Sequence, residues 1–263
     1  MTGSGTTTRR VRLIGVGPGD PEQVTVQALR AMREVAFFIV TDKGRPDGSA
    51  DPLAHVRRRL LDRHLGYTPD VVHVPDPDRE RRPERTADTA SYERAVADWH
   101  SARAVAFEEA LLARRGDAGF LVWGDPAFYD STIRILDDVA ARGHVTIELE
   151  VIPGISSLQL LAARHRIVLH EVGQPLHVTT GRRLHEAVEA GQDNIAVMLN
   201  RDLALDGLDD WRIWWGANLG TEHEETITGR VGDVRPDLEA ARARAREAAG
   251  WVMDVFLLRR GTA

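Results

Sequence analysis

Short apolar runs alternate with amphipathic stretches along the first two thirds of the chain. The runs have the length of single strands and are largely continuous, which is typical of strands buried on both faces of a parallel sheet. They are "RVRLIGV" (10–16), "VAFFIV" (35–40), "DVVHVP" (70–75), "AGFLVW" (118–123) and "TIELEVI" (146–152).

Segments with helical spacing separate these runs. The first carries its apolar face at Val24, Ala28, Ala31, Met32 and Val35. Further helices are predicted over 50–65, 89–115, 131–142 and from "PGISS" to about His165. Repeated strand–turn–helix units predict an α/β domain with a mostly parallel sheet and helices on its faces.

The pattern changes beyond about residue 172, where strand candidates follow one another with only short helices expected between them. These candidates are "PLHVTT" (175–180), "NIAVML" (194–199), "WRIWWGA" (211–217), "EETITGRV" (224–231) and "WVMDVFLLRR" (251–260). Residues 211–217 and 224–230 are neighbours and are expected to form a hairpin. Trp211, Trp214 and Trp215 are expected in the core and dimer surface of this region rather than in a stacking platform.

The chain is therefore expected to form two domains. Residues 1–9 are small and polar and are predicted to be a disordered lead-in. Residues 10–172 form the N-terminal α/β domain, and 173–263 form a C-terminal α+β domain with a mixed sheet, joined near "HEVGQP". A chain of 263 residues is long enough to give each domain its own core.

Composition excludes several kinds of chemistry. There are no cysteines, so disulfides and thiolate catalysis are excluded, and the ten histidines show no metal-ligand spacing, so no metal is expected. A net charge of −6 disfavours nucleic acid as a partner. No run approaches a membrane span and no signal-peptide pattern is present, so a cytoplasmic location without membrane contact is expected.

Three glycine turns carry the candidate chemistry. "GPGDP" (17–21), "WGDPAFYD" (123–130) and "IPGISS" (152–157) each follow an apolar strand, so in a parallel sheet all three lie at the carboxyl edge, where such sheets bind ligands. Glycine there lets a ligand approach the backbone. Alternatively, the glycines and prolines only make tight turns, with Asp20 or Thr25 capping the next helix.

Two phosphate-binding interpretations are disfavoured. Asp20 stands where a dinucleotide-binding turn would need its third glycine, and no Gly-Lys-Ser/Thr ending of a nucleotide triphosphate loop occurs. The turns therefore predict a ligand that is held through main-chain donors and acceptors rather than through a phosphate cradle.

The order and spacing of "VGPGDP", "LVWGDPAFYD" and "VIPGISS" resemble the tetrapyrrole (precorrin) methylases, which use S-adenosyl-L-methionine and yield S-adenosyl-L-homocysteine. The resemblance continues through "HVTTGRR" (177–183) and "GANLGTEHEETITGRVGDV" (216–234). It implies the two-domain tetrapyrrole methylase fold with the cofactor in a cleft between the domains, a tetrapyrrole substrate and a homodimer.

Within that family, "TDKG" (41–44), "ARHRI" (163–167) and "GWVMDVFLLRR" (250–260) are most similar to the deacetylating branch. That branch is a C-methyltransferase of aerobic cobalamin biosynthesis, which methylates precorrin-5 at ring carbon 1 and releases acetate. Two alternatives stay open. One is a methyltransferase of the same fold acting on another precorrin, RNA or protein, and the other is a cofactor-binding module without catalysis.

The resemblance also implies site residues, carried over position by position. The cofactor contacts it implies are Pro18, Trp123, Gly124, Asp125, Ser156, Ser157, Leu199, Asn200, Leu219, Gly220, Arg230 and Val231. Asn200 or Leu199 stands where the family often has a methionine that contacts adenine. In each Gly-Asp-Pro the aspartate is expected to brace its turn as well.

Precorrins carry several carboxylates, so cationic side chains are expected at the substrate, where arginine can form two parallel hydrogen bonds. The candidates for substrate binding are Gly17, Arg45, Arg134, Arg182 and Arg183, although most arginines are solvated surface charges. Loss of the acetyl group requires water activated near a ketone, for which Asp42, Tyr129 and Lys43 are candidates. Each could instead have a purely structural role: Asp42 as a cap, Tyr129 as a packed phenol and Lys43 as a surface ammonium.

Overall fold

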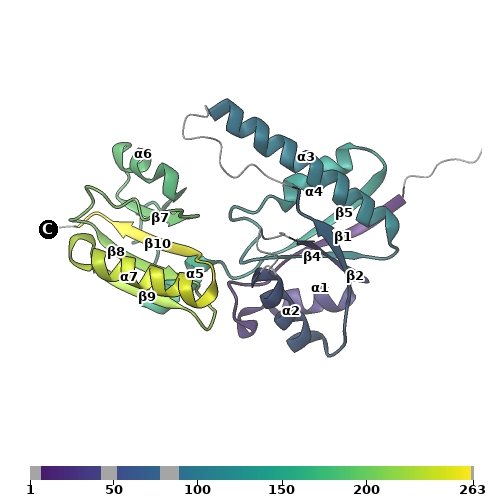
Figure 1. The fold of residues 1–263 in the computed structure, drawn as a ribbon, viewed down its shortest axis with the longest axis horizontal. Helices are drawn as coiled ribbons and strands as arrows, with labels where there is room; N and C mark the ends of the chain where they lie inside the picture. The colour runs from purple at the N-terminus through teal and green to yellow at the C-terminus, as the bar shows by residue number, and fades with distance from the viewer. Residues whose placement is uncertain (1–6, 43–51, 78–88, 262–263) are drawn as a thin grey trace, which may run out of the picture. The chain divides into compact units, whose positions relative to one another are not determined.

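A computed structural model describes residues 7–42, 52–77 and 89–261. Its internal contacts divide the chain into two compact units. The first unit consists of Met1–Gly17 and Val24–Gly154, and the second of Pro18–Gln23 and Ile155–Ala263 (Figure 1). The chain thus passes between the units at three points, and the short segment Pro18–Gln23 belongs with residues more than a hundred positions away.

The first unit is built around a parallel sheet with the strand order β3-β2-β4-β1-β5. The strands are β1 (Thr7–Gly15), β2 (Phe37–Asp42), β3 (Asp70–Pro75), β4 (Ala118–Val122) and β5 (Val145–Ile152). The helices are α1 (Val26–Glu34), α2 (Pro52–Leu65), α3 (Thr89–Ala113) and α4 (Thr132–Ala141). Every strand and helix expected from the sequence of this part is present.

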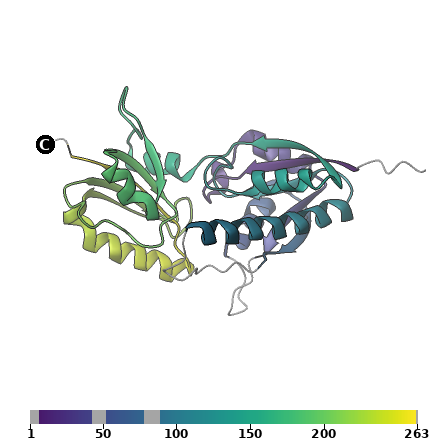
Figure 2. The same cartoon turned by 90° about the horizontal axis from the view of Figure 1, so that it is seen from above.

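Helices cover both faces of this sheet, because successive side chains of a strand point to opposite faces. Leu13 and Phe37 pack with α3 and α4, while Ile14 and Phe38 pack with α1 and α2. Figure 1 shows the sheet between these two helix pairs, and Figure 2 shows α3 as one long helix along the unit. The central strands β2 and β4, and β1 from Val11 onward, are therefore buried on both sides, as predicted, whereas most residues of the edge strands β3 and β5 are not buried.

The N-terminal strand begins earlier than expected. β1 pairs with β5 from Thr7 opposite Val145 to Ile14 opposite Ile152, so the last three residues of the predicted lead-in belong to the sheet. Ladder hydrogen bonds to β5 order these polar residues although few of them are buried. Residues 1–6 lie outside the described part of the chain.

The second unit holds a mixed sheet with the strand order β6-β7-β10-β8-β9. Its strands are β6 (His177–Thr180), β7 (Asn194–Met198), β8 (Arg212–Ala217), β9 (Glu225–Arg230) and β10 (Asp254–Arg259). Its helices are α5 (Ser157–His165), α6 (Leu184–Glu189), α7 (Val231–Ala249) and the 3-10 turns η1 (Pro21–Gln23) and η2 (Gly181–Arg183). The predicted hairpin is confirmed, since β8 pairs antiparallel with β9 from Arg212 opposite Arg230.

Two cores cover the faces of this second sheet. Trp215 packs with α6 and α7, whereas its neighbour Trp214 packs with α5 on the other face. Trp211 is buried with the α7 core, so the expectation that these tryptophans belong to the core is confirmed. The expectation of short helices only is wrong, because α7 has 19 residues and buries a stripe at Val231, Leu238, Ala241 and Ala245.

Residues 155–172 cluster with the second unit, whereas the sequence pattern assigned them to the first domain. The leucines of α5, Leu158, Leu160 and Leu161, pack against the second sheet, which explains this grouping. No helix in the described ranges is both long enough and apolar enough to cross a membrane.

A buried carboxylate ties α3 to the end of α4. Glu108 on α3 accepts hydrogen bonds from Arg142 Nε at 2.9 Å and contacts His144 Nδ1 at 3.1 Å. Burial alone would raise the pKa of Glu108, but the hydrogen bonds from Arg142 and His144 outweigh it, so the pKa of this carboxyl is lowered. The ionised form is therefore stabilised in the folded state.

Glu108→Gln is expected to reduce the free energy of unfolding by about 2 kcal/mol at neutral pH, because the variant loses a charge-assisted hydrogen bond. Since the pKa of Glu108 is lowered on folding, its contribution is complete above the unfolded-state value of about 4.3 and is lost as the pH falls through the lower folded-state value. Urea unfolding at several pH values measures this difference. Glu109→Gln, an exposed neighbour on the same helix, should show no such difference at any pH.

Candidate functional site

The three glycine turns meet at one edge of the first sheet, as predicted. They follow β4, β1 and β5, which are adjacent strands, at their carboxyl ends. Past the strands, Gly17 N donates to Gly124 O at 3.2 Å and Gly124 N donates to Gly17 O at 2.8 Å. The first and second turns are therefore joined directly through their main chains.

The third turn packs against the other two through glycine. A Cβ atom on Gly154 would overlap the carbonyl oxygen of Gly124 and would lie 2.8 Å from the carbonyl carbon of Gly15. Only glycine permits this approach of three backbone segments. These glycines thus pack against one another, and a ligand at this edge would meet a surface that the packed turns have already shaped.

The aspartates of the two Gly-Asp-Pro sequences brace their turns in the same way, which confirms that expectation. Asp20 Oδ1 accepts a hydrogen bond from Glu22 N at 2.9 Å, and Asp125 Oδ1 accepts one from Ala127 N at 2.8 Å. Side chains of this kind commonly bond the backbone two residues on. Asp125 does more, because its Oδ2 also accepts from Gly154 N at 2.8 Å and so links the second turn to the third.

The first Gly-Asp-Pro lies in the second unit, whereas the second lies in the first unit. Pro18 is buried, and Gly19 and Asp20 lie beside Gly220 in the loop after β8. A Cβ on Gly220 would be 3.1 Å from Asp20 N and 3.2 Å from Gln23 Oε1. The sequence order alone gave no sign that these segments touch.

Strand directions decide which candidates of the second unit share an edge. β6, β7 and β8 run one way and β9 and β10 the other, so the ends of the first three lie beside the starts of the last two. Leu199, Asn200, Leu219 and Gly220 lie at this edge. Arg230 ends β9 and Val231 begins α7 at the opposite edge, about 17 Å away at ~3.3 Å per residue.

The two residues at the opposite edge have other contacts. Val231 is fully buried in the α7 core, and Arg230 is exposed and paired with Asp210. The structure therefore does not bring Arg230 and Val231 together with the other cofactor candidates of this unit. Leu219 is also buried, packing in the α5 core, so it presents main-chain atoms rather than its side chain.

Ser156 and Ser157 begin α5. Ser156 is the N-cap: its Oγ accepts from Gln159 N at 3.3 Å, and its own N donates to Gln159 Oε1 at 2.8 Å. This reciprocal pair is a capping box, so Ser156 is required by the helix itself. Ser157 is half-buried at the first helical position.

Exposed apolar side chains and buried hydrogen-bond acceptors occur in the loop after β7 and in other segments of the same unit. Leu199 has a left-handed backbone (φ 55°), and its side chain is 60% exposed. Met253, which directly precedes β10, is 37% exposed. Asn200 Oδ1 and Gln23 Oε1 are both buried, and neither has a hydrogen-bond partner within the described residues.

Sequence reasoning missed the buried residue that holds Met253 in place, Asn218. Asn218 holds the main chain of Met253 through two hydrogen bonds: Met253 N donates to the side-chain Oδ1 of Asn218 at 2.9 Å, and Asn218 N donates to Met253 O at 2.8 Å. Its left-handed backbone (φ 49°) is a conformation that asparagine tolerates better than most residues. An asparagine directly before Leu-Gly was the available signal.

A buried arginine of the first unit was missed as well. Arg103 on α3 stacks on Trp99 and Phe107, and its Nη2 donates to Thr41 Oγ1 at 2.8 Å near the end of β2. Its Nε lies 3.6 Å from Asp76 Oδ1, just past β3. Burial lowers the pKa of Arg103, against the opposing effect of Asp76 and Asp130. A cation therefore lies at the carboxyl edge of β2 and β3.

The remaining site candidates named from the sequence lie on different elements of the two units. Tyr129 is 46% exposed in the loop between β4 and α4, with a left-handed backbone, and Arg134 is exposed on α4. Trp123 is half-buried before Gly124. Arg182 and Arg183 are exposed in η2, directly after β6, and Arg183 pairs with Glu186. Lys43, Arg45 and the side chain of Asp42 lie outside the described residues.

The comparison with known families decides the class of protein. The sequence model of the tetrapyrrole (corrin/porphyrin) methylases matches residues 10–235. The chain belongs to this family. The match spans both compact units and includes all three glycine turns.

Curated relatives place this tetrapyrrole methylase near one enzyme in particular. Precorrin-6A synthase (deacetylating) of Sinorhizobium sp is 42% identical over 258 residues, which are 96% of this chain and 96% of that protein. Precorrin-2 C(20)-methyltransferase of Sinorhizobium sp is 33% identical over 152 residues, which are 56% of this chain and 55% of that protein.

Solved structures have the same fold as the methylase. A cobalamin-synthesis-related protein (CobF) from Corynebacterium diphtheriae superposes with a TM-score of 0.79 at 32% identity, covering 97% of this chain and 99% of that chain. Uroporphyrin-III C-methyltransferase from Thermus thermophilus, solved in complex with S-adenosyl homocysteine, has a TM-score of 0.54 at 18% identity, covering 95% and 92%. The two-domain tetrapyrrole methylase fold expected from the sequence is confirmed.

Proposed function

We propose that this methylase converts precorrin-5 to precorrin-6A, transferring a methyl group from S-adenosyl-L-methionine to ring carbon 1 and releasing acetate. The observation that carries the proposal is the 42% identity to precorrin-6A synthase (deacetylating) over 96% of both chains. Segments outside the shared glycine turns resemble the same branch, which separates it from relatives that match little more than half of the chain.

The residues of the second unit fit S-adenosyl-L-methionine. The cofactor offers hydrogen-bond donors in its adenine amino group, ribose hydroxyls and ammonium group, and the buried oxygens of Gln23 and Asn200 are acceptors that lack a donor in the described chain. The exposed side chains of Leu199 and Met253 offer apolar surface for a flat ring. When bound, the cofactor supplies a methyl group on positively charged sulfur.

Other main-chain atoms complete this proposed cofactor site. Those of Pro18 and Gly220 belong to the same edge of the second unit, since Gly220 lies against the loop that Pro18 begins. Trp123, Gly124, Asp125 and Ser157 stay proposals for cofactor contact. The Thermus relative that was solved with S-adenosyl homocysteine supports the same class of cofactor for this fold.

On the substrate side, the proposal requires cations and a group that polarises a ketone. Arg103, Arg134 and Arg182 are proposed to meet substrate carboxylates, and the phenol of Tyr129 is proposed to polarise the acetyl oxygen. Water adds to that ketone, the bond from ring carbon 1 to the acetyl group breaks, and acetate leaves with loss of protons to solvent. The electron pair of the broken bond stays on ring carbon 1, which takes the methyl group.

The decisive assay supplies precorrin-5 and methyl-labelled S-adenosyl-L-methionine. We expect labelled precorrin-6A and one acetate for each methyl group transferred. Precorrin-2, the compound for which the relative precorrin-2 C(20)-methyltransferase is named, is the control substrate and should remain unlabelled. Transfer to precorrin-2 without acetate, or no transfer to precorrin-5, would contradict the assignment.

The proposal includes a homodimer in the cytoplasm. Two valines between α5 and β6, Val168 and Val172, are exposed in the single chain and are available to a second copy. Sedimentation equilibrium should give twice the chain mass, and a concentration-independent monomer would exclude the dimer.

A further inference from the structure

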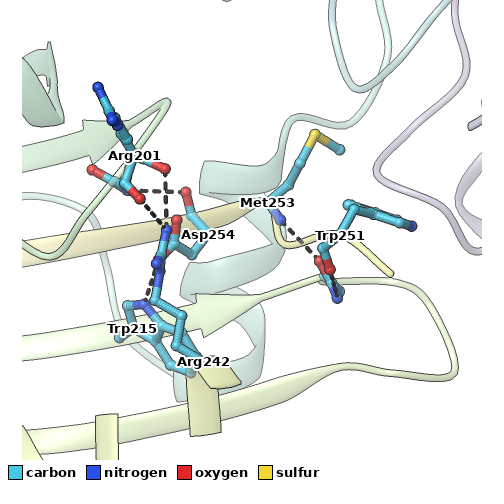
Figure 3. A network of polar contacts seen from close by, with 8 residues as sticks. Arg201, Trp215, Arg242, Trp251, Met253 and Asp254 are labelled. Atoms are coloured by element: carbon cyan, nitrogen blue, oxygen red, sulfur yellow. Dashed lines mark hydrogen bonds and ion pairs between the residues drawn. The ribbon is translucent and has the colours of Figure 1, made fainter. Parts of the chain in front are cut away.

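One side chain of α7 holds the loop after β7 from within the fold. Arg242 Nη2 donates to Arg201 O at 2.8 Å and to Asn200 O at 3.3 Å. Its Nε donates to Asp254 Oδ2 at 2.8 Å. Figure 3 shows Arg242 between Asp254, Trp215 and the main chain of Arg201. The guanidinium therefore connects a carboxylate of β10 to two successive carbonyls of the loop.

The anchor of this connection is rigid. The Asp254 side chain is completely buried and that of Arg242 is 11% exposed. Asp254 Oδ2 also accepts from Trp215 Nε1 at 3.2 Å, and the main-chain oxygen of Asp254 accepts from Asn200 Nδ2 at 3.0 Å. The loop is thus fixed from both α7 and β10, through its main chain and through Asn200.

The shape of the loop needs such a restraint. A left-handed backbone at a residue other than glycine, as at Leu199, is unfavourable and persists only where surrounding contacts determine it. Arg242 supplies contacts to the two residues that follow. The restrained loop presents the apolar Leu199 side chain outward, while the Asn200 amide oxygen is buried beside Gly181 and receives no hydrogen bond from the part of the chain that the structure describes.

We propose that Arg242, anchored by Asp254, is a positioning residue that holds Leu199–Arg201 in the conformation that binds the adenosine part of S-adenosyl-L-methionine. The inference rests on the proposed function, since it assumes that this edge of the second unit is the cofactor site. Apolar surface beside an unsatisfied acceptor matches a purine ring, which has flat apolar faces and an amino donor. Arg242 itself does not touch the cofactor and acts through the loop.

The structural alternative is that Arg242 and Asp254 only stabilise the fold, and a double variant separates the two roles. Arg242→Met alone leaves the buried Asp254 charge unpaired, which is strongly destabilising. Arg242→Met combined with Asp254→Asn removes both charges, keeps an acceptor for Trp215 and retains the apolar stem at 242. This double variant is expected to regain most of the thermal stability of the wild type, but the loop carbonyls remain without their donor.

Calorimetry with S-adenosyl-L-homocysteine is the test. We expect the double variant to bind about 10- to 100-fold more weakly than the wild type, by analogy with the loss found when the hydrogen-bond partner of a metal ligand is removed. The KM for S-adenosyl-L-methionine should rise by the same factor, with kcat and the KM for precorrin-5 changed far less. Arg244→Gln, an exposed residue of the same helix that pairs with Glu225, is the matched control and should bind normally.

A stable double variant that binds S-adenosyl-L-homocysteine as the wild type does would overturn the positioning role, and so would a wild type that does not bind it. The proposed function fails separately, if the wild type binds S-adenosyl-L-homocysteine but does not methylate precorrin-5. In that case the affinity of the double variant for S-adenosyl-L-homocysteine still shows whether Arg242 is a positioning residue.

Discussion

Gly154→Ala is expected to destabilise the first unit by about 3 kcal/mol, near the upper end of the usual range for overpacking. The added methyl group would overlap the Gly124 carbonyl oxygen and crowd the carbonyl carbon and Cα of Gly15. These three atoms belong to the backbone, which cannot move aside as a flexible side chain can. Thermal unfolding followed by circular dichroism should show Tm lower by roughly 6–12 °C. Methyl transfer should fall with it, because the same contact shapes the edge where the three turns meet.

The control for this prediction is Gly66→Ala. Gly66 has a positive φ of 68°, but a Cβ there would meet nothing within 4 Å. Its substitution therefore tests backbone strain without a clash and is expected to cost about 1–2 kcal/mol. Gly154 has the opposite combination, a severe clash without a positive φ. Equal losses in the two variants would show that the three turns do not pack as described.

Local patterns predicted the first unit well, because its central strands β2 and β4 are buried on both faces and are almost entirely apolar in sequence. "VAFFIV" and "AGFLVW" could only be central strands, and the glycine turns after such strands had to share the carboxyl edge of a parallel sheet. The gathering of Gly17, Gly124 and Gly154 therefore followed from topology. Their packing against one another did not, because a sequence does not show how closely two backbones approach.

The helices of the second unit were harder to predict from the sequence, and the polar helix α7 shows the reason. α7 buries Val231, Leu238, Ala241 and Ala245, mostly small residues, on a helix rich in arginine and glutamate. Such a stripe is a faint periodic signal. The role of Arg242 is equally invisible in the sequence, because its partners lie 12 and 41 positions away.

Site residues carried over from the family by sequence position lie apart where strand direction separates neighbouring positions. The resemblance to the family implied that Arg230 and Val231 share the cofactor site with Gly220, which precedes them by about ten positions. The intervening β9 runs antiparallel to β8 and carries the chain to the far edge of the sheet. Conversely, Pro18–Gln23 lies against Gly220 although two hundred residues separate them. Sequence distance is misleading in both cases, since contacts between strands and loops depend on topology.

Asp125→Ala is expected to lower kcat/KM for methyl transfer by about 100-fold, the size of effect that a small misplacement of binding groups produces. The carboxylate of Asp125 accepts from Ala127 N and Gly154 N, and so fixes the second turn to the third. Alanine leaves the half-buried Gly154 amide without its acceptor, which should also cost about 2 kcal/mol of stability. Steady-state kinetics on precorrin-5 and urea unfolding measure the two effects.

Two further variants show which of the bonds matters. Asp125→Asn keeps one oxygen, enough for the turn at Ala127 or for the link to Gly154 but not for both, so an intermediate loss of kcat/KM is expected. Asp20→Ala removes the same brace from the first Gly-Asp-Pro, where the carboxylate accepts from Glu22 N within its own turn. Because that bond is exposed and local, its loss should cost less than about 1 kcal/mol. If Asp20→Ala destabilised the protein as much as Asp125→Ala, the link between the second and third turns would not be what distinguishes the two aspartates.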